Sequence, residues 1–443
     1  MKPPEPDLSR TAGRVLLTQW ATVRGNQAGM PLLVRGEGAH VWDSDGRKLL
    51  DTLSGCWSVS IGYGRREIAR SVYRQLRTLS YAPLDWRAHR PAVELAVRLL
   101  ALAPPGMERI FFCSGGAEGV EIALQLSRQF MRATGQPRRD IVLYRSNSYH
   151  GATLGALSVT GQEFARLSCD GLVSGTSPVC QADCARCPLG LTHPDCALAC
   201  VDSVEQAILK IGAERVAALI AEPVPAFERV LLAPAGYWPK LKAMLDRYGV
   251  LLIFDEVVTG MGRTGRWFAA SHWDVAPDLI VLAKGLSGGY APLGAVLIGE
   301  KVASRLQDAV IAGYTFGGHP ASCAAALATL DVLQGLLPDV SERGAQLLAG
   351  LTRLSSARPF TGAVAGIGLL ASMELRLDAA SQRELARHLR DEGLLCLVED
   401  SVLPIAPPLC VSGTEIRFLL SALESALVKL ERGHSPQPSP LHK

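Results

Sequence analysis

The chain has 443 residues, of which 48% are hydrophobic and 20% are charged, and its formal net charge is +3. This length predicts two or more structural domains with ample apolar material for a core. A balance so close to neutral, without a basic run, argues against nucleic-acid binding, and we expect no stretch apolar enough to span a membrane. The N-terminal MKPPEPDLSR carries prolines and acids instead of an apolar signal core, so we expect a cytoplasmic protein.

The N-terminal part of the chain predicts strands followed by helices. Residues 14–60 combine a short helical pattern with alternating residues and turn signals typical of hairpins, as in VRGEGAHVWDSDGRKLLDTLSG. Amphipathic patterns then predict helices at Arg65–Thr78 and Ala92–Leu102.

A glycine turn follows these helices in RIFFCSGGAEGVEIALQLSRQF (109–130), which predicts a strand, a turn and a helix. Backbone N–H groups at a helix N-terminus bind anions. Gly115 and Gly116 permit close approach of a ligand just before Ala117, where the helix is expected to begin. Most such turns serve packing alone, but this one is also a candidate phosphate site.

Four short apolar runs in the middle of the chain predict strands buried on both faces, as in a parallel sheet. They are 141–146, Val216–Ala221, Val250–Phe254 and Leu279–Ala283, with a helix expected at Tyr237–Tyr248. Three of the runs are followed at once by a charged residue: Glu222, Asp255 and Lys284.

Asp255 and Lys284 are expected to meet, because ligands of open α/β sheets bind at the carboxyl ends of the strands. Gly285, Gly288 and Gly289 would let the backbone approach that ligand. Pyridoxal 5′-phosphate (PLP) needs a lysine amine for a Schiff base and an acid near its ring nitrogen. The alternative is that Asp255 caps a turn and Lys284 lies on the surface.

The eleven cysteines are an odd number in a long chain, which argues against a disulfide framework. Five of them crowd into one expected loop, 169–200: Cys180, Cys184, Cys187, Cys196 and Cys200. The spacing of Cys184 and Cys187 is typical of metal ligands, so zinc or an iron–sulfur cluster is one hypothesis. A loop of packed free thiols is the other.

Two long motifs carry a resemblance to a known family. DEVVTGMGRTG (255–265) and DLIVLAKGLSGGYAPLGA (278–295) resemble the class III aminotransferases, the ω-amino group of fold-type I PLP enzymes, and the similarity extends over nearly the whole chain. The resemblance implies an α/β fold with a large PLP-binding domain (66–325) around a mostly parallel sheet. A smaller α+β domain would combine segments 1–65 and 326–431, and the Pro- and Ser-rich tail 432–443 is expected to be disordered.

The same resemblance implies roles for the cofactor site. Lys284 would hold PLP as a Schiff base, and Asp255 would pair with the pyridine nitrogen. Val257 would pack on one ring face, and Tyr149, from NSYHGATLGALSVTG (147–161), on the other. Glu222 would support the Asp255 region, although it could instead only anchor the following loop.

Two further residues are implied to complete the active site. Trp57, in LSGCWSVSIGYG (53–64), would form part of the substrate wall, with an ordinary core position as the alternative. Thr315, in GYTFGGHPASC (313–323), would reach the partner's cofactor phosphate, which implies a homodimer with shared active sites. His150 is expected to act as a structural hydrogen-bonder.

The chain departs from the family pattern at two positions. Ala117 lacks the hydroxyl that relatives place at the phosphate turn, so backbone groups would hold the phosphate. In LLCLVEDSVLPIAPPL (394–409), Leu397 stands where many relatives have an arginine that binds the substrate carboxylate, and no arginine lies between Asp391 and Cys410. Either another arginine substitutes, or the usual α-keto acid partner is not preferred.

We therefore expect a PLP-dependent aminotransferase that moves an amino group from an amine or ω-amino donor to a keto or aldehyde acceptor in a ping-pong cycle. A racemase, epimerase or aminomutase on the same fold is the alternative. A non-catalytic binding protein is disfavoured by the presence of both Lys284 and Asp255.

Overall fold

The computed structural model describes residues 7–19, 30–227, 229–398 and 401–433. Its centre is a seven-stranded sheet with the order β4-β10-β9-β8-β7-β5-β6. The strands are β4 (Met107–Cys113), β5 (Ile141–Arg145), β6 (Thr176–Val179), β7 (Val216–Ala221), β8 (Leu251–Asp255), β9 (Leu279–Leu282) and β10 (Gly294–Gly299). The five neighbours from β9 to β6 run parallel, whereas β10 is antiparallel to both β9 and β4. The predicted mostly parallel sheet is thus confirmed.

Continuous apolar runs form these strands because helices cover both faces of the sheet. In β8, Leu251 and Ile253 pack into the core with α5 (Gly116–Ala133), whereas Leu252 and Phe254 pack with α8 (Ala199–Ile211) and α9 (Tyr237–Arg247). A strand without an exposed face has no position for a polar residue until it ends. The carboxyl ends of the strands are therefore where charged residues appear.

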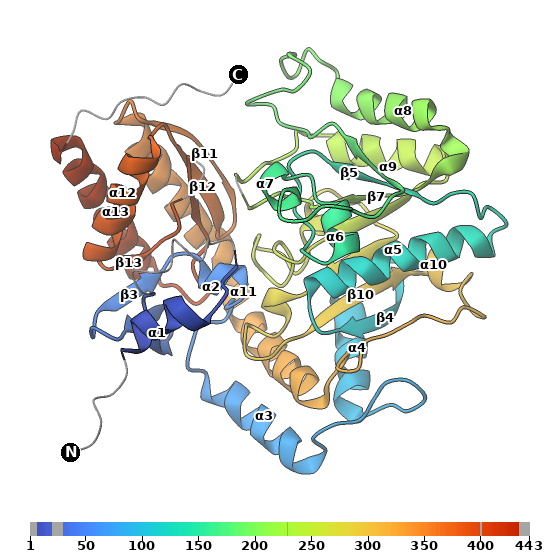
Figure 1. Cartoon of the computed structure of the whole chain (residues 1–443), viewed down its shortest axis with the longest axis horizontal. Helices are drawn as coiled ribbons and strands as arrows, with labels where there is room; N and C mark the ends of the chain where they lie inside the picture. The colour runs from blue at the N-terminus through green and yellow to red at the C-terminus, as the bar shows by residue number, and fades with distance from the viewer. Residues whose placement is uncertain (1–6, 20–29, 228, 399–400, 434–443) are drawn as a thin grey trace.

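The two ends of the chain form a second body of structure, in which blue N-terminal elements lie beside red C-terminal ones (Figure 1). One sheet has the order β1-β2-β3-β13, and β13 from the C-terminal part pairs in parallel with β3 through Leu394 and Leu50. A third sheet has the order β11-β12-β14. The strands are β1 (Leu33–Glu37), β2 (His40–Asp43), β3 (Lys48–Asp51), β11 (Thr361–Ile367), β12 (Leu370–Leu375), β13 (Leu394–Leu395) and β14 (Val402–Ile405).

Two of the remaining helices agree closely with the bounds expected from the sequence. Those predicted at Arg65–Thr78 and Ala92–Leu102 are α3 (Arg66–Thr78) and α4 (Arg90–Leu102). Further helices are α1 (Leu8–Val15), α2 (Ser54–Trp57), α6 (Leu154–Ser158), α7 (Glu163–Arg166), α10 (Glu300–Ala303), α11 (Pro320–Ser356), α12 (Ala379–Asp391) and α13 (Gly413–Gly433), with short 3₁₀ turns η1 (Ala213–Arg215), η2 (Ala269–His272) and η3 (Lys284–Leu286).

Two expectations need correction. Helix α13 continues to Gly433, two residues into the segment 432–443 that was expected to be disordered, and residues 434–443 lie outside the described part. Helix α11 is long and apolar enough to span a membrane, contrary to the expectation from the sequence. However, 56% of its apolar window is buried inside the protein, where it packs against α3, α4 and β11. Its apolar residues therefore serve the core.

Candidate active site

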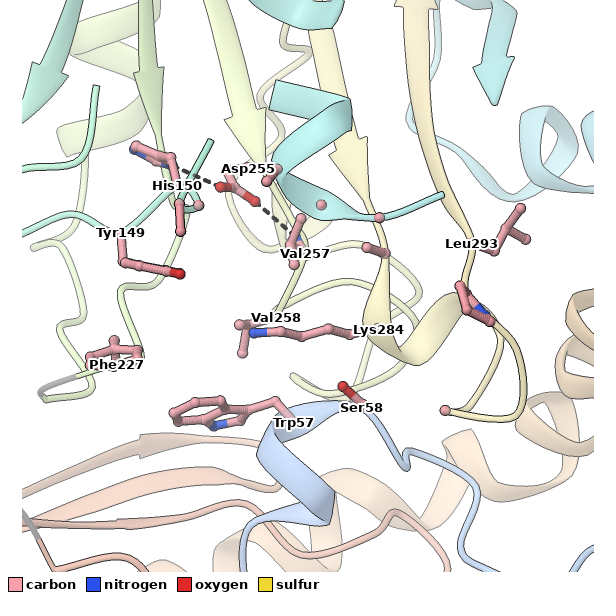
Figure 2. A pocket seen from close by; sticks show the side chains of 18 of the residues that line it. Trp57, Ser58, Tyr149, His150, Phe227, Asp255, Val257, Val258, Lys284 and Leu293 are labelled. Atoms are coloured by element: carbon pink, nitrogen blue, oxygen red, sulfur yellow. Dashed lines mark hydrogen bonds and ion pairs between the residues drawn. The ribbon is translucent and has the colours of Figure 1, made fainter. Parts of the chain in front are cut away.

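Asp255 and Lys284 meet at the carboxyl end of the central sheet. Asp255 is the last residue of β8, and Lys284 follows the neighbouring parallel strand β9 after one residue. Both line a cavity of about 790 Å³. The other lining residues include these predicted ones: Trp57, Gly115, Gly116, Ala117, Tyr149, Glu222 and Val257. Figure 2 shows the Lys284 side chain extending across the cavity between Asp255 above and Trp57 below.

Asp255 is held on both of its carboxylate oxygens. Oδ1 accepts a hydrogen bond of 3.0 Å from the Val257 backbone N–H, and Oδ2 lies 2.7 Å from His150 Nδ1. The His150 side chain is fully buried, and its Nε2 has no partner within the described residues. The histidine acts as a hydrogen-bonder, as expected, and it fixes the plane of the carboxylate.

Lys284 is buried in a largely apolar setting. Its Nζ lies 5.1 Å from the centroid of the Trp57 ring. Burial lowers the pKa of Lys284, while Cys56, Asp255 and Glu222 act in the opposite direction. The neutral amine, which is the nucleophilic form, is thereby favoured.

The predicted anion site lies at the start of α5. Its N-cap residue Gly115 makes no side-chain cap bond, and among the described residues, apart from its chain neighbours, no atom lies within 4 Å of the place where a Cβ would stand. At Gly116, by contrast, a Cβ would come within 3.0 Å of Val257. Free N–H groups beside open space suit a phosphate, and Ala117 adds no side-chain donor. Together with the buried amine and the fixed carboxylate, this turn fits PLP.

Tyr149 and Glu222 are joined directly. The Tyr149 backbone N–H donates to Glu222 Oε1 over 3.0 Å. Burial raises the pKa of Glu222, and His150, the Tyr149 N–H and Arg145 counteract that effect in part. Glu222 therefore anchors the segment that carries Tyr149, which precedes it in the chain, and it also borders the cavity.

Trp57 reaches the cavity from the short turn α2 in a left-handed conformation with φ 59°. Such a backbone costs about 1–3 kcal/mol in a non-glycine residue, so the surrounding structure must impose it. The Asp51 carboxylate holds the turn by accepting from the N–H groups of Leu53 and Gly55 at 2.9 and 2.7 Å. Trp57 is thus a buried residue that also forms the cavity wall.

Phe227 was missed by the sequence reasoning. Its ring stacks on Tyr149 with 5.1 Å between centroids and lies 6.0 Å from Trp57, closing one end of the cavity (Figure 2). The sequence contains only a weak indication of Phe227, because it is a single aromatic residue in the loop after Glu222-Pro223 and belongs to no periodic pattern.

Two predicted residues lie outside the cavity. Thr315 is exposed, and its carbonyl oxygen accepts from the Tyr81 hydroxyl at 2.6 Å. Leu397 is half-buried and does not line the cavity. Among the described residues, no arginine lines the cavity. The structure therefore offers no substitute in the cavity for the arginine that binds the substrate carboxylate in many relatives.

The cysteine-rich loop contains free thiols. Four of the five predicted residues, Cys184, Cys187, Cys196 and Cys200, line a small hollow of about 20 Å³. Nevertheless, within the described ranges no group of three or more His, Cys, Asp or Glu side chains is arranged to hold a metal ion. The structure therefore gives no support to the zinc or iron–sulfur hypothesis.

Comparison with known proteins agrees with this geometry. The family description "Aminotransferase class-III" matches residues 23–427. A probable aminotransferase of Mycobacterium tuberculosis is 36% identical, with 97% of this chain and 96% of the relative covered. The putrescine–pyruvate aminotransferase of Pseudomonas aeruginosa is 32% identical over 91% of each chain.

Solved structures lead to the same group. An (S)-enantioselective ω-transaminase from Thermomicrobium roseum superposes with a TM-score of 0.92 at 36% identity, covering 96% of this chain and 98% of its own. The chain therefore belongs to the class III aminotransferases: it is a PLP-dependent aminotransferase of fold type I.

Proposed function

We propose that this aminotransferase takes its amino group from an amine or ω-amino compound that lacks an α-carboxylate, and passes it to a small keto or aldehyde acceptor in a ping-pong cycle. The observation that carries this proposal is the lining of the cavity. Aromatic rings form its wall, and no arginine among the described residues is placed to bind a carboxylate bidentately. The names of the relatives give no support to a racemase, epimerase or aminomutase.

Each residue of the site has a separate role in the proposed reaction. When bound, PLP supplies a conjugated ring that withdraws electrons from the reacting substrate carbon. Lys284 would hold the cofactor covalently through its Nζ, and its free amine would move the proton at the substrate carbon as general base and general acid. Asp255 would keep the ring nitrogen protonated, and His150 holds Asp255 in position. The N-terminus of α5 would bind the phosphate through backbone N–H groups.

The hydrophobic residues orient the reactants and exclude water. Val257 and Tyr149 would hold the two faces of the cofactor ring, where aromatic stacking contributes about 0.5–1.5 kcal/mol beyond burial. Trp57 and Phe227 surround the apolar part of the amine. Glu222 holds the Tyr149 backbone in place.

The active unit is a homodimer in the cytoplasm, with Thr315 of each subunit completing the phosphate site of its partner. The exposure of Thr315 and of its neighbour Phe316 supports this arrangement, because neither lines the cavity of its own chain. We retain 66–325 as the cofactor-binding domain, and 1–65 with 326–431 as the smaller one.

A panel of donors tests the proposal. Monoamines, diamines, ω-amino acids and α-amino acids are each assayed with pyruvate and with 2-oxoglutarate as acceptors. We expect the highest kcat/KM for donors without an α-carboxylate, and a preference for pyruvate, the acceptor named for the Pseudomonas aeruginosa relative. A clear preference for α-amino donors would contradict the proposed substrate class without affecting the assignment to the family.

A further inference from the structure

Phe227 stands between two hollows of different character. On one side it lines the active-site cavity of about 790 Å³, and on the other it lines a hollow of about 220 Å³. Of the described residues, it alone borders both. The smaller hollow is polar and includes Asp183, Arg186 and Arg229. The phenyl ring thus separates an apolar substrate space from a charged one.

Aromatic contacts fix the position of the Phe227 ring. It stacks on Tyr149 and on Phe164, with centroid distances of 5.1 and 5.7 Å, and is tilted against Trp57. Its side chain also packs against a buried cluster that includes Val224 and Leu370. The ring is therefore held by both the large sheet region and β12.

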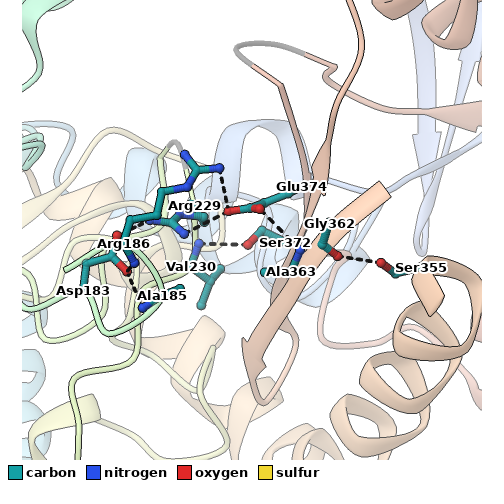
Figure 3. Close-up of polar contacts among 10 residues, drawn as sticks. All are labelled: Asp183, Ala185, Arg186, Arg229, Val230, Ser355, Gly362, Ala363, Ser372 and Glu374. Atoms are coloured by element: carbon teal, nitrogen blue, oxygen red, sulfur yellow. Dashed lines mark hydrogen bonds and ion pairs between the residues drawn. The ribbon is translucent and has the colours of Figure 1, made fainter. Parts of the chain in front are cut away.

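The loop that carries Phe227 is tied to β12 by charges. Arg229, two residues further on, places Nη1 2.9 Å from Glu374 Oε1 and also pairs with Asp183 (Figure 3). The next residue, Val230, donates its N–H to Ser372 Oγ at 2.9 Å. The side chains of Arg229, Asp183 and Glu374 are each no more than 13% exposed, so these contacts are shielded from solvent.

The two arginines behind Phe227 are already neutralised. Glu374 Oε1 also lies 3.1 Å from Arg186 Nη2, so the two carboxylates Asp183 and Glu374 balance the two guanidinium groups. A substrate carboxylate that passed Phe227 would have to displace one of them. Among its described lining residues, the smaller hollow therefore offers additional room but no free cation.

We propose that Phe227 is a specificity-determining residue, which limits the size of the amine's larger substituent by closing the passage into this hollow. The Arg229–Glu374 contact positions it. This inference rests on the proposed function, since it concerns amines without an α-carboxylate. Removing the ring should join the two hollows and admit longer or wider substituents.

The test compares two amines in the PLP-loaded enzyme with pyruvate: sec-butylamine and 1-(2-naphthyl)ethylamine. The measured quantity is the ratio of kcat/KM for the naphthyl amine to that for the small one. We expect Phe227→Ala to raise this ratio about tenfold or more, the scale of discrimination that an apolar pocket provides. Phe227→Tyr, which keeps a ring of similar size, should leave the ratio near that of the wild type.

A second measurement does not depend on turnover of the bulky amine. 2-Acetonaphthone, the matching ketone, is tested as an inhibitor of sec-butylamine turnover in the wild type, Phe227→Leu and Phe227→Ala. We expect its inhibition constant to fall in that order. An unchanged ratio together with an unchanged inhibition constant would overturn the proposal, whereas failure of the wild type to use sec-butylamine at all would instead refute the proposed function.

The positioning role of the ion pair needs its own control. Glu374→Gln removes the charge that faces Arg229 and should raise the naphthyl-to-butyl ratio, by a smaller factor than Phe227→Ala. Asp43→Asn breaks a comparable contact, in which the buried Asp43 lies 2.8 Å from Arg390, away from the cavity. It should leave the ratio unchanged. Equal shifts in both variants, or no shift in Glu374→Gln, would remove the positioning role.

Discussion

His150 Nδ1 lies 2.7 Å from Asp255 Oδ2, and both side chains are buried at the carboxyl end of the central sheet. The bond joins a loop residue after β5 to the last residue of β8, 105 positions apart. Within the described part of the chain, the Asp255 carboxylate has one further hydrogen-bond partner, the Val257 N–H. The orientation of the carboxylate therefore depends on the histidine.

Loss of His150 should slow the reaction without abolishing it. A hydrogen bond to a charged group contributes about 1.5–3 kcal/mol, so we expect His150→Ala to lower kcat about 10- to 100-fold. Asp255→Asn should lower kcat further, because the ring nitrogen then loses its acid. Steady-state kinetics with a saturating amine measure both effects.

Ser127→Ala provides the control for His150. Ser127 is buried in α5, and within the described ranges its hydroxyl bonds only to the Ala123 carbonyl oxygen in its own helix. The Ser127→Ala variant should therefore keep nearly the wild-type kcat. Wild-type kcat in His150→Ala, with an unchanged melting temperature, would show that the bond is not needed to place Asp255.

The lowered pKa of Lys284 predicts the pH dependence of cofactor capture by the apoenzyme. Only the neutral amine attacks PLP, and the group is an acid that loses its proton as the pH rises. A folded-state pKa below the ordinary 10.5 means that the neutral form is present at lower pH than in a free lysine. The rate should therefore increase with pH, with a midpoint below 10.5.

Stopped-flow absorbance of the yellow product measures this midpoint. Asp255→Asn is the informative variant, because the Asp255 charge raises the pKa of Lys284 and its removal should move the midpoint further down. Lys284→Ala should bind PLP without the change in absorbance that marks the lysine imine, and it should not turn over. A midpoint at or above 10.5 in the wild type would contradict the effect of burial.

The sequence predicted the meeting of Asp255 and Lys284 because both terminate strands buried on two faces, and parallel neighbours end at one edge. It could not predict the contact of His150 with Asp255 in atomic detail. Nor could it identify Phe227, whose position follows from packing against Tyr149 and β12 and has no periodic signal in the chain.

The cysteines show a second limit of prediction from the sequence, which concerns metal sites. The spacing of Cys184 and Cys187 agrees with a metal site, but spacing fixes only the separation along the chain. The three-dimensional arrangement depends on how Asp183 and Arg186 of the same loop attach to Arg229 and Glu374. That attachment joins residues far apart in sequence, and local patterns cannot anticipate it.

A shared active site predicts complementation between two inactive subunits. Thr315→Ala should weaken PLP binding, and Lys284→Ala should abolish turnover. In a hybrid dimer, one site combines the intact Lys284 of one subunit with the intact Thr315 of the other. We therefore expect the hybrid to regain activity that neither parent has at low PLP concentration.

Co-expression with two different affinity tags isolates that hybrid. Light scattering should give twice the chain mass of 47.3 kDa. The exposed Trp86 and Phe316 suggest where subunits meet, so Trp86→Glu should reduce the dimer fraction. A single-chain mass at full activity would contradict the dimer, and a hybrid no more active than its parents would contradict the role of Thr315.

The cysteine-rich loop should remain folded without a metal, since ion pairs attach it to the rest of the protein. Burial raises the pKa of Cys180 and Cys184, and that of Cys200 to about 11, so these thiols are protonated at neutral pH. We expect metal analysis of protein purified without oxygen to find zinc and iron near zero per subunit. A chelator should leave the melting temperature unchanged.

Substitutions separate the thiols from the ion pairs. The double variant Cys184→Ser/Cys196→Ser should change the free energy of unfolding by about 1 kcal/mol or less. Arg229→Met should cost more, about 3–5 kcal/mol, because it leaves Asp183 and Glu374 buried without their shared partner. Cys169→Ser, outside the hollow, serves as the matched control. The metal hypothesis would be restored if the wild type contained one zinc or iron per subunit and the double variant lost both this metal and stability. Only metal coordination would let two thiols change the free energy of unfolding by so much.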